Sequence, residues 1–412
     1  MKIKLENIGY FLFFLMIVVP VSFKTLKLVL TILLITYIVL KKKTAFSLDV
    51  IILSIIYTIM GFLWVIYGYI MNTPGALRVS TVHVIYPMLF TLLLSLITKF
   101  EHIENLNKLI LLSNLFISIY ATWVILFVLK IIPDSYFINL FGENLTYSPK
   151  GKSLAIAFSA LPTLFFSIPY LIAKLLSQSR VNFLLKNSNL VLLLIFTLFI
   201  SIINRRNALY LVILLSPIIT LYFKSFLPFA KKKYTIKFKS LLIYGTLLII
   251  IFILGISFLT NINLSNIITD FFAGFDFKND ASASVRRLQF FSLTNSWLES
   301  PLIGHGLGAG TELTRSTEMP WAYELYYLSI LHNMGILGFS IYVFGIVWIY
   351  KNGILIIKKG INLSYYMIYI LVGFTTFLIA SATNPYIGKF DYMWVIFIPV
   401  AFINYYKLNI ND

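Results

Sequence analysis

Three ionisable side chains are the first candidates for chemistry: His332 and the adjacent pair Arg286 and Arg287. His332 lies in an apolar stretch from residue 325 to 350, where an ionisable side chain is costly and therefore indicates a function. Its imidazole could act as a general base near neutral pH, and paired guanidinium groups suit bidentate binding of phosphate. These residues predict chemistry on an anionic substrate. The alternative interpretation of His332 is a packing or helix-capping residue bonded to a carbonyl.

A second pair, Arg205 and Arg206, interrupts an apolar stretch from residue 190 to 223 that is too long for one membrane span. The stretch is predicted to form two short helices that turn at the arginines. The pair would then lie at the N-terminus of the second helix, where unpaired N–H groups favour an anion. Two cations at this positive end of a helix are unfavourable unless an anion joins them. Phosphate binding is therefore favoured over snorkelling to the membrane interface.

Glu324 and a glycine-rich segment, residues 301–310, complete the polar candidates. Glu324 precedes His332 by about two helical turns, so a direct contact between them is not assured. The glycines permit tight turns and close approach of the backbone to a ligand, but a flexible connector explains them equally well. Metal-ligand spacing is absent from the histidines and carboxylates, and neither a metal nor a cofactor is expected. The other histidines are His83, His102 and His305.

Composition defines the class of protein. Of the 412 residues, 59% are hydrophobic and 12% are charged, and there is no cysteine. Apolar stretches recur at the length needed to cross a bilayer core of about 30 Å, without the alternation of barrel strands. The sequence predicts an all-α polytopic membrane protein, residues 1–412 forming one integral membrane domain. About twelve spans are expected: 8–23, 26–40, 48–70, 79–97, 106–129, 153–176, 190–203, 208–223, 241–259, 325–350, 364–380 and 392–406.

The basic residues predict the orientation of these spans. With the N- and C-termini in the cytoplasm, the inner loops and termini hold more than half of the 33 basic residues, as the positive-inside rule expects. The net charge of +18 is then a topology signal near anionic lipid, and nucleic acid is not an expected partner. The arginines other than Arg180 fall on the outer side, where basic residues need another explanation.

The outer loop 260–324 is predicted to contain a helix that begins near Ser284 and carries the second arginine pair in its first turn. Phe290, Leu293 and Trp297 recur at helical spacing, with Phe291 and Leu298 beside them. This pattern is typical of a helix lying on the membrane surface.

Five segments, in this order, resemble the O-antigen polymerase and O-antigen ligase family of bacterial inner-membrane glycosyltransferases. The first 190 residues match that family in hydropathy alone, while the segments cover residues 204–391. They are Arg206-Asn207-Ala208, Arg287-Leu288-Gln289-Phe290 before Trp297, Pro301 to Gly308, Glu324 with His332 to Gly338, and Thr383-Asn384-Pro385.

The resemblance implies a GT-C-like membrane enzyme that transfers sugar on the periplasmic face of the inner membrane. The reaction would be inverting and metal-independent, with undecaprenyl-pyrophosphate-linked oligosaccharides as substrates. By position, Arg206 and Arg287 would hold the pyrophosphate, with Arg205 and Arg286 as doubled neighbours that leave the active member of each pair open. His332 would activate the acceptor hydroxyl, and Glu324 would orient the acceptor or the loop.

Within the family, the composition favours an O-antigen polymerase, which joins lipid-linked repeat units. A ligase that moves the polymer to lipid A-core needs the same residues, and a capsule or exopolysaccharide polymerase fits as well. A lipid-linked oligosaccharide flippase is the alternative from another class, although transporters usually carry charge at the bilayer midplane and show related halves. A chain-length regulator is an expected partner from the resemblance alone.

Overall fold

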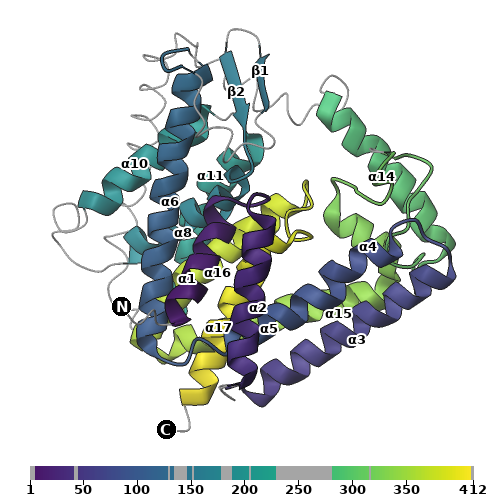
Figure 1. The fold of residues 1–412 in the computed structure, drawn as a ribbon, viewed down its shortest axis with the longest axis horizontal. Coiled ribbons are helices and arrows are strands. Elements are labelled where there is room, and N and C mark those ends of the chain that lie inside the picture. The colour runs from purple at the N-terminus through teal and green to yellow at the C-terminus, as the bar shows by residue number, and fades with distance from the viewer. Residues whose placement is uncertain are drawn as a thin grey trace.

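The fold is described by a computed structural model that covers residues 5–40, 45–128, 130–133, 146–150, 153–177, 188–203, 206–228, 281–314 and 317–409 (Figure 1). Helices follow the apolar stretches of the sequence, because a helix satisfies all its central backbone groups internally in lipid. The helices of the first half are α1 (Leu5–Val18), α2 (Lys24–Leu40), α3 (Leu48–Ile70), α4 (Ala76–Ser80), the π-helical η1 (Thr81–Ile85), α5 (Tyr86–Leu94) and α6 (Phe100–Val128). The later helices are η2 (Leu161–Thr163), α8 (Leu164–Ser177), α10 (Ser188–Ile203), α11 (Asn207–Lys224), α14 (Ala281–Glu299), α15 (Tyr326–Lys359), α16 (Asn362–Ser381), η4 (Phe390–Tyr392) and α17 (Trp394–Asn409).

Six helical stretches of the described chain are long and apolar enough to cross a membrane: α3, the continuous run Ala76–Leu94, α6, α11, α15 and α16. Shorter apolar helices occupy Glu6–Val18, Leu161–Ser177 and Ser188–Ser201. The protein is therefore a helical membrane protein, as the sequence predicts. The predicted span 241–259 lies outside the described residues.

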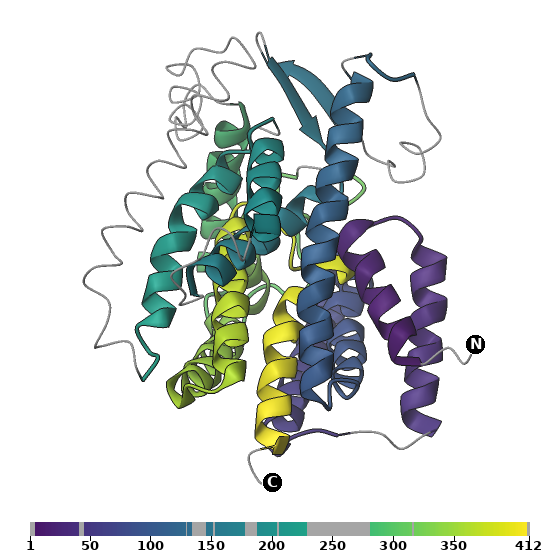
Figure 2. The ribbon, with the colours of Figure 1, turned by 90° about the vertical axis from the view of Figure 1, so that its left-hand side faces the viewer.

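One predicted span begins differently. Residues 153–157 form strand β2 (Ser153–Ala157), which pairs antiparallel with β1 (Thr146–Lys150) in a two-stranded hairpin. The helical part of the predicted span 153–176 therefore starts at Leu161. The hairpin lies at one end of the helix bundle, the hairpin end, beside α6 (Figure 2).

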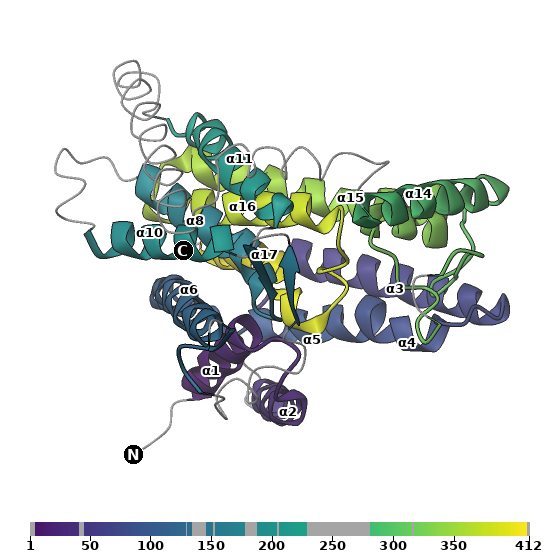
Figure 3. The same cartoon turned by 90° about the horizontal axis from the view of Figure 1, so that it is seen from above.

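The most deeply buried of the six long helices is α16, which packs between α8, α11 and α15. Large aromatic side chains fill the space around it, among them Phe166, Phe374, Phe377 and Trp394. Viewed from above, α17 separates α1 and α6 from α11 and α16 (Figure 3).

Contacts between distant loops tie the hairpin end together. Lys27, at the start of α2, forms a buried ion pair with Asp391, whose second oxygen accepts the backbone N–H of Val21. The Tyr392 hydroxyl donates to the carbonyl of Ser159. The segment between α16 and α17 is thus held from both sides of the bundle, which positions Tyr386 within it.

Candidate functional site

The break between α10 and α11 places Arg206 at a helix N-terminus. Arg206 is the N-cap of α11, in an extended conformation with φ −97° and ψ 109°, and its carbonyl accepts the N–H of Leu209 at 2.9 Å. The prediction of two short helices that turn at the arginines is confirmed for Arg206. Arg205 lies outside the described residues.

Arg206 is directed to a tyrosine that the sequence analysis did not identify. Its Nη1 donates a hydrogen bond of 3.0 Å to the hydroxyl of Tyr386, which lies in the segment after α16 and is 7% exposed. The Tyr386 ring packs against Phe165 and Tyr392, with ring centroids 5.6 and 5.9 Å apart. The signal in the sequence was the resembling segment Thr383-Asn384-Pro385, which precedes this tyrosine by one residue.

The buried Tyr386 phenol is influenced by charges from both arginine regions. Burial raises the pKa of the Tyr386 phenol above its ordinary value, while the charges of Arg206 and Arg286 act to lower it and that of Glu324 acts to raise it. Arg286, from α14, donates through Nε to Glu324 Oε2 at 2.9 Å. The charges of two arginines and one carboxylate, from three separate segments, therefore all act on one buried phenol. Their summed charge is positive, which favours an anionic ligand.

The two arginines of α14 differ in position. The Arg286 side chain is 26% exposed and faces Glu324, whose side chain is 11% exposed. Arg287 is exposed, and its guanidinium carbon lies 5.9 Å from the centre of the Phe291 ring. Successive helical residues point about 100° apart, so one member alone can face the site. The structure places Arg286 there, although the resemblance matched Arg287.

Helix α14 packs against the protein mainly through a face that carries polar residues. Its inward face carries Arg286, Gln289, Leu293 and Ser296 at helical spacing, and Leu293 and Gln289 are almost fully buried. Of the predicted apolar stripe, Leu293 is buried, whereas Phe290, Phe291 and Leu298 are 49%, 50% and 60% exposed. The position of this helix on the membrane surface stays a prediction. The helix turns its polar residues toward the protein because their hydrogen-bonding partners are there.

Glu324 is fixed through its backbone as well as its side chain. The Oε1 atom of Gln289 accepts the N–H of Glu324 at 3.0 Å, in a buried hydrogen bond. Gln289 follows Arg286 by three residues, a spacing that places both on the same side of a helix. That spacing is the feature of the sequence that could have indicated Gln289, which belongs to the resembling segment Arg287-Leu288-Gln289-Phe290.

Helix α15 is interrupted at Gly335, whose backbone has φ 61° and ψ −171°. A break in a helix leaves carbonyls before it and N–H groups after it without their usual partners. The segment 301–308 supplies partners on both sides of this break. The N–H groups of His305 and Gly306 bond to the carbonyls of His332 and Asn333, and the N–H groups of Ile336 and Leu337 bond to the carbonyls of Pro301 and Leu302, at 2.9–3.1 Å.

The glycines of this segment allow its close approach to the protein's own backbone. A Cβ atom on Gly304 would lie 2.5 Å from the nitrogen of Gly335, and one on Gly308 would lie 2.3 Å from the carbonyl carbon of Gly75. Gly304 and Gly308 have positive φ values. The segment is therefore a tightly packed and hydrogen-bonded part of the structure, which differs from the expectation of a flexible connector or a ligand-binding turn.

His332 lies at this break, in an enclosed polar cluster. The residue is 0% exposed, its Nδ1 lies 3.1 Å from Asn333 Oδ1, and its Nε2 lies 3.1 Å from Ser296 Oγ. Because the amide oxygen accepts a proton from Nδ1, Nε2 is the accepting nitrogen of the neutral ring. His305 stacks on it at 4.8 Å between ring centroids. The hydrogen bonds of the His332 ring are thus made to this cluster, and the arginines pair with Tyr386 and Glu324.

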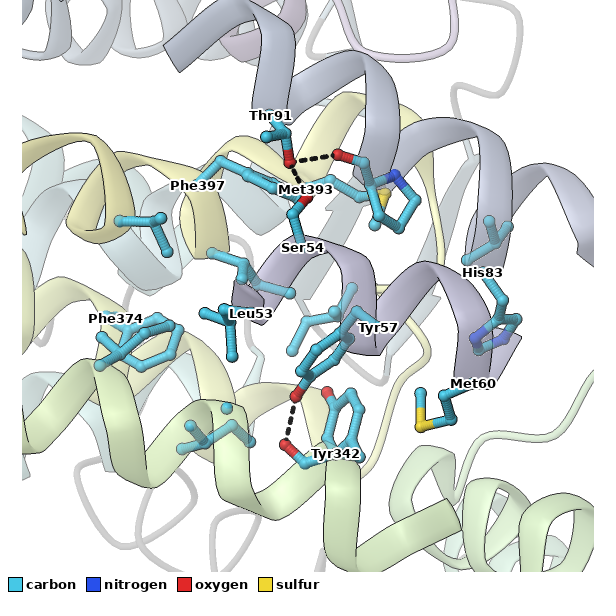
Figure 4. Close-up of a pocket in the computed structure, with 18 of the residues that line it drawn as sticks. Leu53, Ser54, Tyr57, Met60, His83, Thr91, Tyr342, Phe374, Met393 and Phe397 are labelled. Atoms are coloured by element: carbon cyan, nitrogen blue, oxygen red, sulfur yellow. Dashed lines mark hydrogen bonds between the residues drawn. The ribbon is translucent and has the colours of Figure 1, made fainter. Parts of the chain in front are cut away.

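An apolar pocket of about 100 Å³ lies among α3, α5, α15, α16 and α17 (Figure 4). Tyr57 donates from its hydroxyl to the carbonyl of Tyr342 at one wall, at 2.6 Å. The pocket is separate from the charged residues of the site, but Tyr326 and Ile387 in its lining are close in sequence to Glu324 and Tyr386. No arginine is among the residues that line it.

No protein-family model and no curated protein sequence matches this chain. In the described parts of the chain, no group of three or more histidine, aspartate or glutamate side chains could hold a metal ion. The helices define a membrane protein, and the convergence of Arg206, Arg286, Glu324 and Tyr386 defines a candidate anion-binding site at the ends of its helices.

Proposed function

We propose that the protein is a glycosyltransferase of the O-antigen polymerase type, which joins lipid-linked repeat units through metal-independent, inverting sugar transfer. The observations that carry this proposal are the hydrogen bond from Arg206 to Tyr386 and the ion pair of Arg286 with Glu324, whose charges all act on the Tyr386 phenol. Two guanidinium groups suit a pyrophosphate, and a neighbouring carboxylate supplies a base for a sugar hydroxyl.

In this proposal Arg206 and Arg286 bind the diphosphate of the lipid-linked donor. Glu324 accepts the proton of the acceptor hydroxyl, whose oxygen forms a bond to the anomeric carbon. The bond from that carbon to the pyrophosphate oxygen breaks, and its electron pair leaves with the diphosphate. Fixed guanidinium groups stabilise the negative charge that develops there. The resulting linkage is inverted at the anomeric carbon.

Arg286 has two roles in this scheme. Its ion pair with Glu324 offsets the cost of a largely buried carboxylate in the absence of substrate. When a diphosphate arrives, Arg286 turns to it, and Glu324 becomes a stronger base. Donor binding and activation of the acceptor are thereby coupled. His332, whose ring nitrogens are engaged elsewhere, then stabilises the break in α15 rather than taking the proton.

The distribution of charge supports a periplasmic site. The described arginines Arg78, Arg206, Arg286 and Arg287 fall in segments predicted to lie on the outer side, whereas Lys224, Lys359 and Lys407 lie in the last turns of α11, α15 and α17, which are predicted to end in the cytoplasm. Lysine-rich ends favour the cytoplasm. The apolar pocket among the spans suits part of an isoprenoid chain whose diphosphate reaches the arginines.

The test is the lipopolysaccharide pattern of a deletion strain complemented with the wild-type gene, Glu324→Gln or Glu312→Gln. Glu312 is exposed in the same loop and provides the matched control. We expect a single repeat on lipid A-core without the gene or with Glu324→Gln, and a full ladder with the other two. Loss of all O-antigen from lipid A-core, with long chains remaining on undecaprenyl pyrophosphate, would identify a ligase instead. A full ladder with Glu324→Gln would refute the role of this carboxylate.

A further inference from the structure

Gln289 holds a buried amide whose orientation is determined by its neighbour. The side chain points inward from α14 and the residue is 1% exposed. Its Oε1 accepts the backbone N–H of Glu324 at 3.0 Å. The reversed orientation would set two donors against each other. The amide nitrogen of Gln289 must therefore point away from that N–H group.

This nitrogen is a buried donor in need of an acceptor. Within the part of the chain that the structure describes, Gln289 Nε2 has no hydrogen-bond partner. A buried donor left without an acceptor loses its hydration free energy without compensation. A methionine would fill the same space without that loss. The position of the amide, on the same face of α14 as Arg286 and bonded to the backbone of the candidate base, indicates a ligand oxygen as its partner.

We propose that Gln289 Nε2 donates a hydrogen bond to the sugar hydroxyl of the acceptor, a role that rests on the proposed function. The hydroxyl oxygen accepts this bond with one lone pair and gives its proton to Glu324. Its other lone pair forms the bond to the anomeric carbon, while the bond to the pyrophosphate oxygen breaks. Gln289 is thus a substrate-contacting residue that aims the attacking oxygen, and Arg206 and Arg286 bind the leaving group.

The experiment uses full-length protein in nanodiscs, with a lipid-linked oligosaccharide as saturating donor and the lipid-free repeat-unit oligosaccharide as acceptor. Gln289→Glu keeps an oxygen to accept the Glu324 N–H but removes the donor, and Gln289→Met removes both. Asn295→Asp and Asn295→Leu, on the exposed side of α14, are the matched controls. Binding of undecaprenyl pyrophosphate alone is measured for each variant, together with thermal unfolding.

We expect kcat/KM for the acceptor to fall about tenfold or more in both Gln289 variants, with unchanged binding of undecaprenyl pyrophosphate and unchanged control variants. Gln289→Glu keeps the contact to Glu324, so a kcat/KM for the acceptor within twofold of the wild type in this variant would overturn the inference. Water would then be the partner of Gln289 Nε2. Weakened binding of undecaprenyl pyrophosphate would also overturn it, because the amide would then serve the diphosphate. If the wild type neither binds that lipid nor extends the acceptor, the proposed function itself fails.

Discussion

Replacing Gly335 with alanine should destabilise the protein, because this residue forms the break in α15. Its φ of 61° and ψ of −171° lie in a region that is essentially restricted to glycine, and another residue there costs about 1–3 kcal/mol. A Cβ atom at this position would also lie 2.3 Å from the carbonyl oxygen of Leu302. That oxygen belongs to the backbone and cannot turn aside as a flexible side chain would.

The magnitude follows from the contacts that the added methyl group displaces. Moving the segment at Leu302 away from the break would lengthen the hydrogen bonds from Ile336 to Pro301 and from Leu337 to Leu302, now 2.9 and 3.1 Å. Each buried bond contributes about 0.5–1.5 kcal/mol net. Together with the backbone strain, the expected loss is about 2–6 kcal/mol, a large fraction of the stability of an ordinary domain.

The assay is thermal unfolding of the purified protein in detergent, followed by tryptophan fluorescence, with Gly310→Ala as the matched control. A Cβ atom on Gly310 would have its nearest contact at 3.1 Å, with the carbonyl oxygen of Pro320, and the φ of Gly310 is not positive. We expect a Tm lowered by at least several degrees in Gly335→Ala and little change in the control. Equal Tm values for the two variants would refute the inference that the segment 301–308 packs tightly against the break at Gly335.

Four further predictions concern the candidate site; activity is measured by chain extension in nanodiscs, and Tm by thermal unfolding. Arg286→Ala should abolish activity, whereas Arg287→Ala should retain most of it, because Arg287 faces outward; equal losses would contradict the assignment within the pair. The exchange Arg286→Glu with Glu324→Arg should restore the ion pair and the Tm without restoring activity, while recovered activity would make the pair purely structural. Tyr386→Phe should lower kcat/KM about tenfold, because it removes the hydroxyl that accepts the hydrogen bond from Arg206 and orients it. Arg206→Lys should retain little activity, because a lysine cannot bind a phosphate group bidentately.

The positions of the helices could be predicted from the sequence, but the faces that they present could not. Apolar length is a strong signal in a membrane protein, since lipid excludes irregular backbone, and the helices α10 and α11 begin and end close to the predicted residues. Lipid tails are as apolar as a protein core, so an apolar stripe does not distinguish inside from outside. For this reason the stripe on α14 did not reveal that Leu293 packs into the protein while Phe291 and Leu298 are exposed.

The choice between His332 and Glu324 depended on contacts that sequence spacing does not contain. Both lie on the same segment and both are nearly inaccessible to solvent, so neither composition nor position separated them. The proposal of Glu324 as the base rests on long-range partners: Arg286 on α14 pairs with Glu324, and Ser296, three turns further along the same helix, lies against His332. About 15 Å of helix separates those two α14 residues, which is too far for one sugar linkage.

Two helix interruptions in the described part of the chain, at Gly335 and at the start of α11, differ in the groups that surround them. Backbone that leaves a helix at membrane depth is tolerated where protein or a polar cavity satisfies it. At Gly335 the segment 301–308 supplies both acceptors and donors, so the break is closed by the protein itself and His332 is buried behind it. At the start of α11 the chain instead presents Arg206, in a position where the helix dipole already opposes a cation. A positive side chain at a positive helix end, oriented by the hydroxyl of Tyr386, becomes favourable when an anion binds between them. In the proposed function, the break at Gly335 therefore supports the site, and the break before α11 is the one that we expect to receive the substrate.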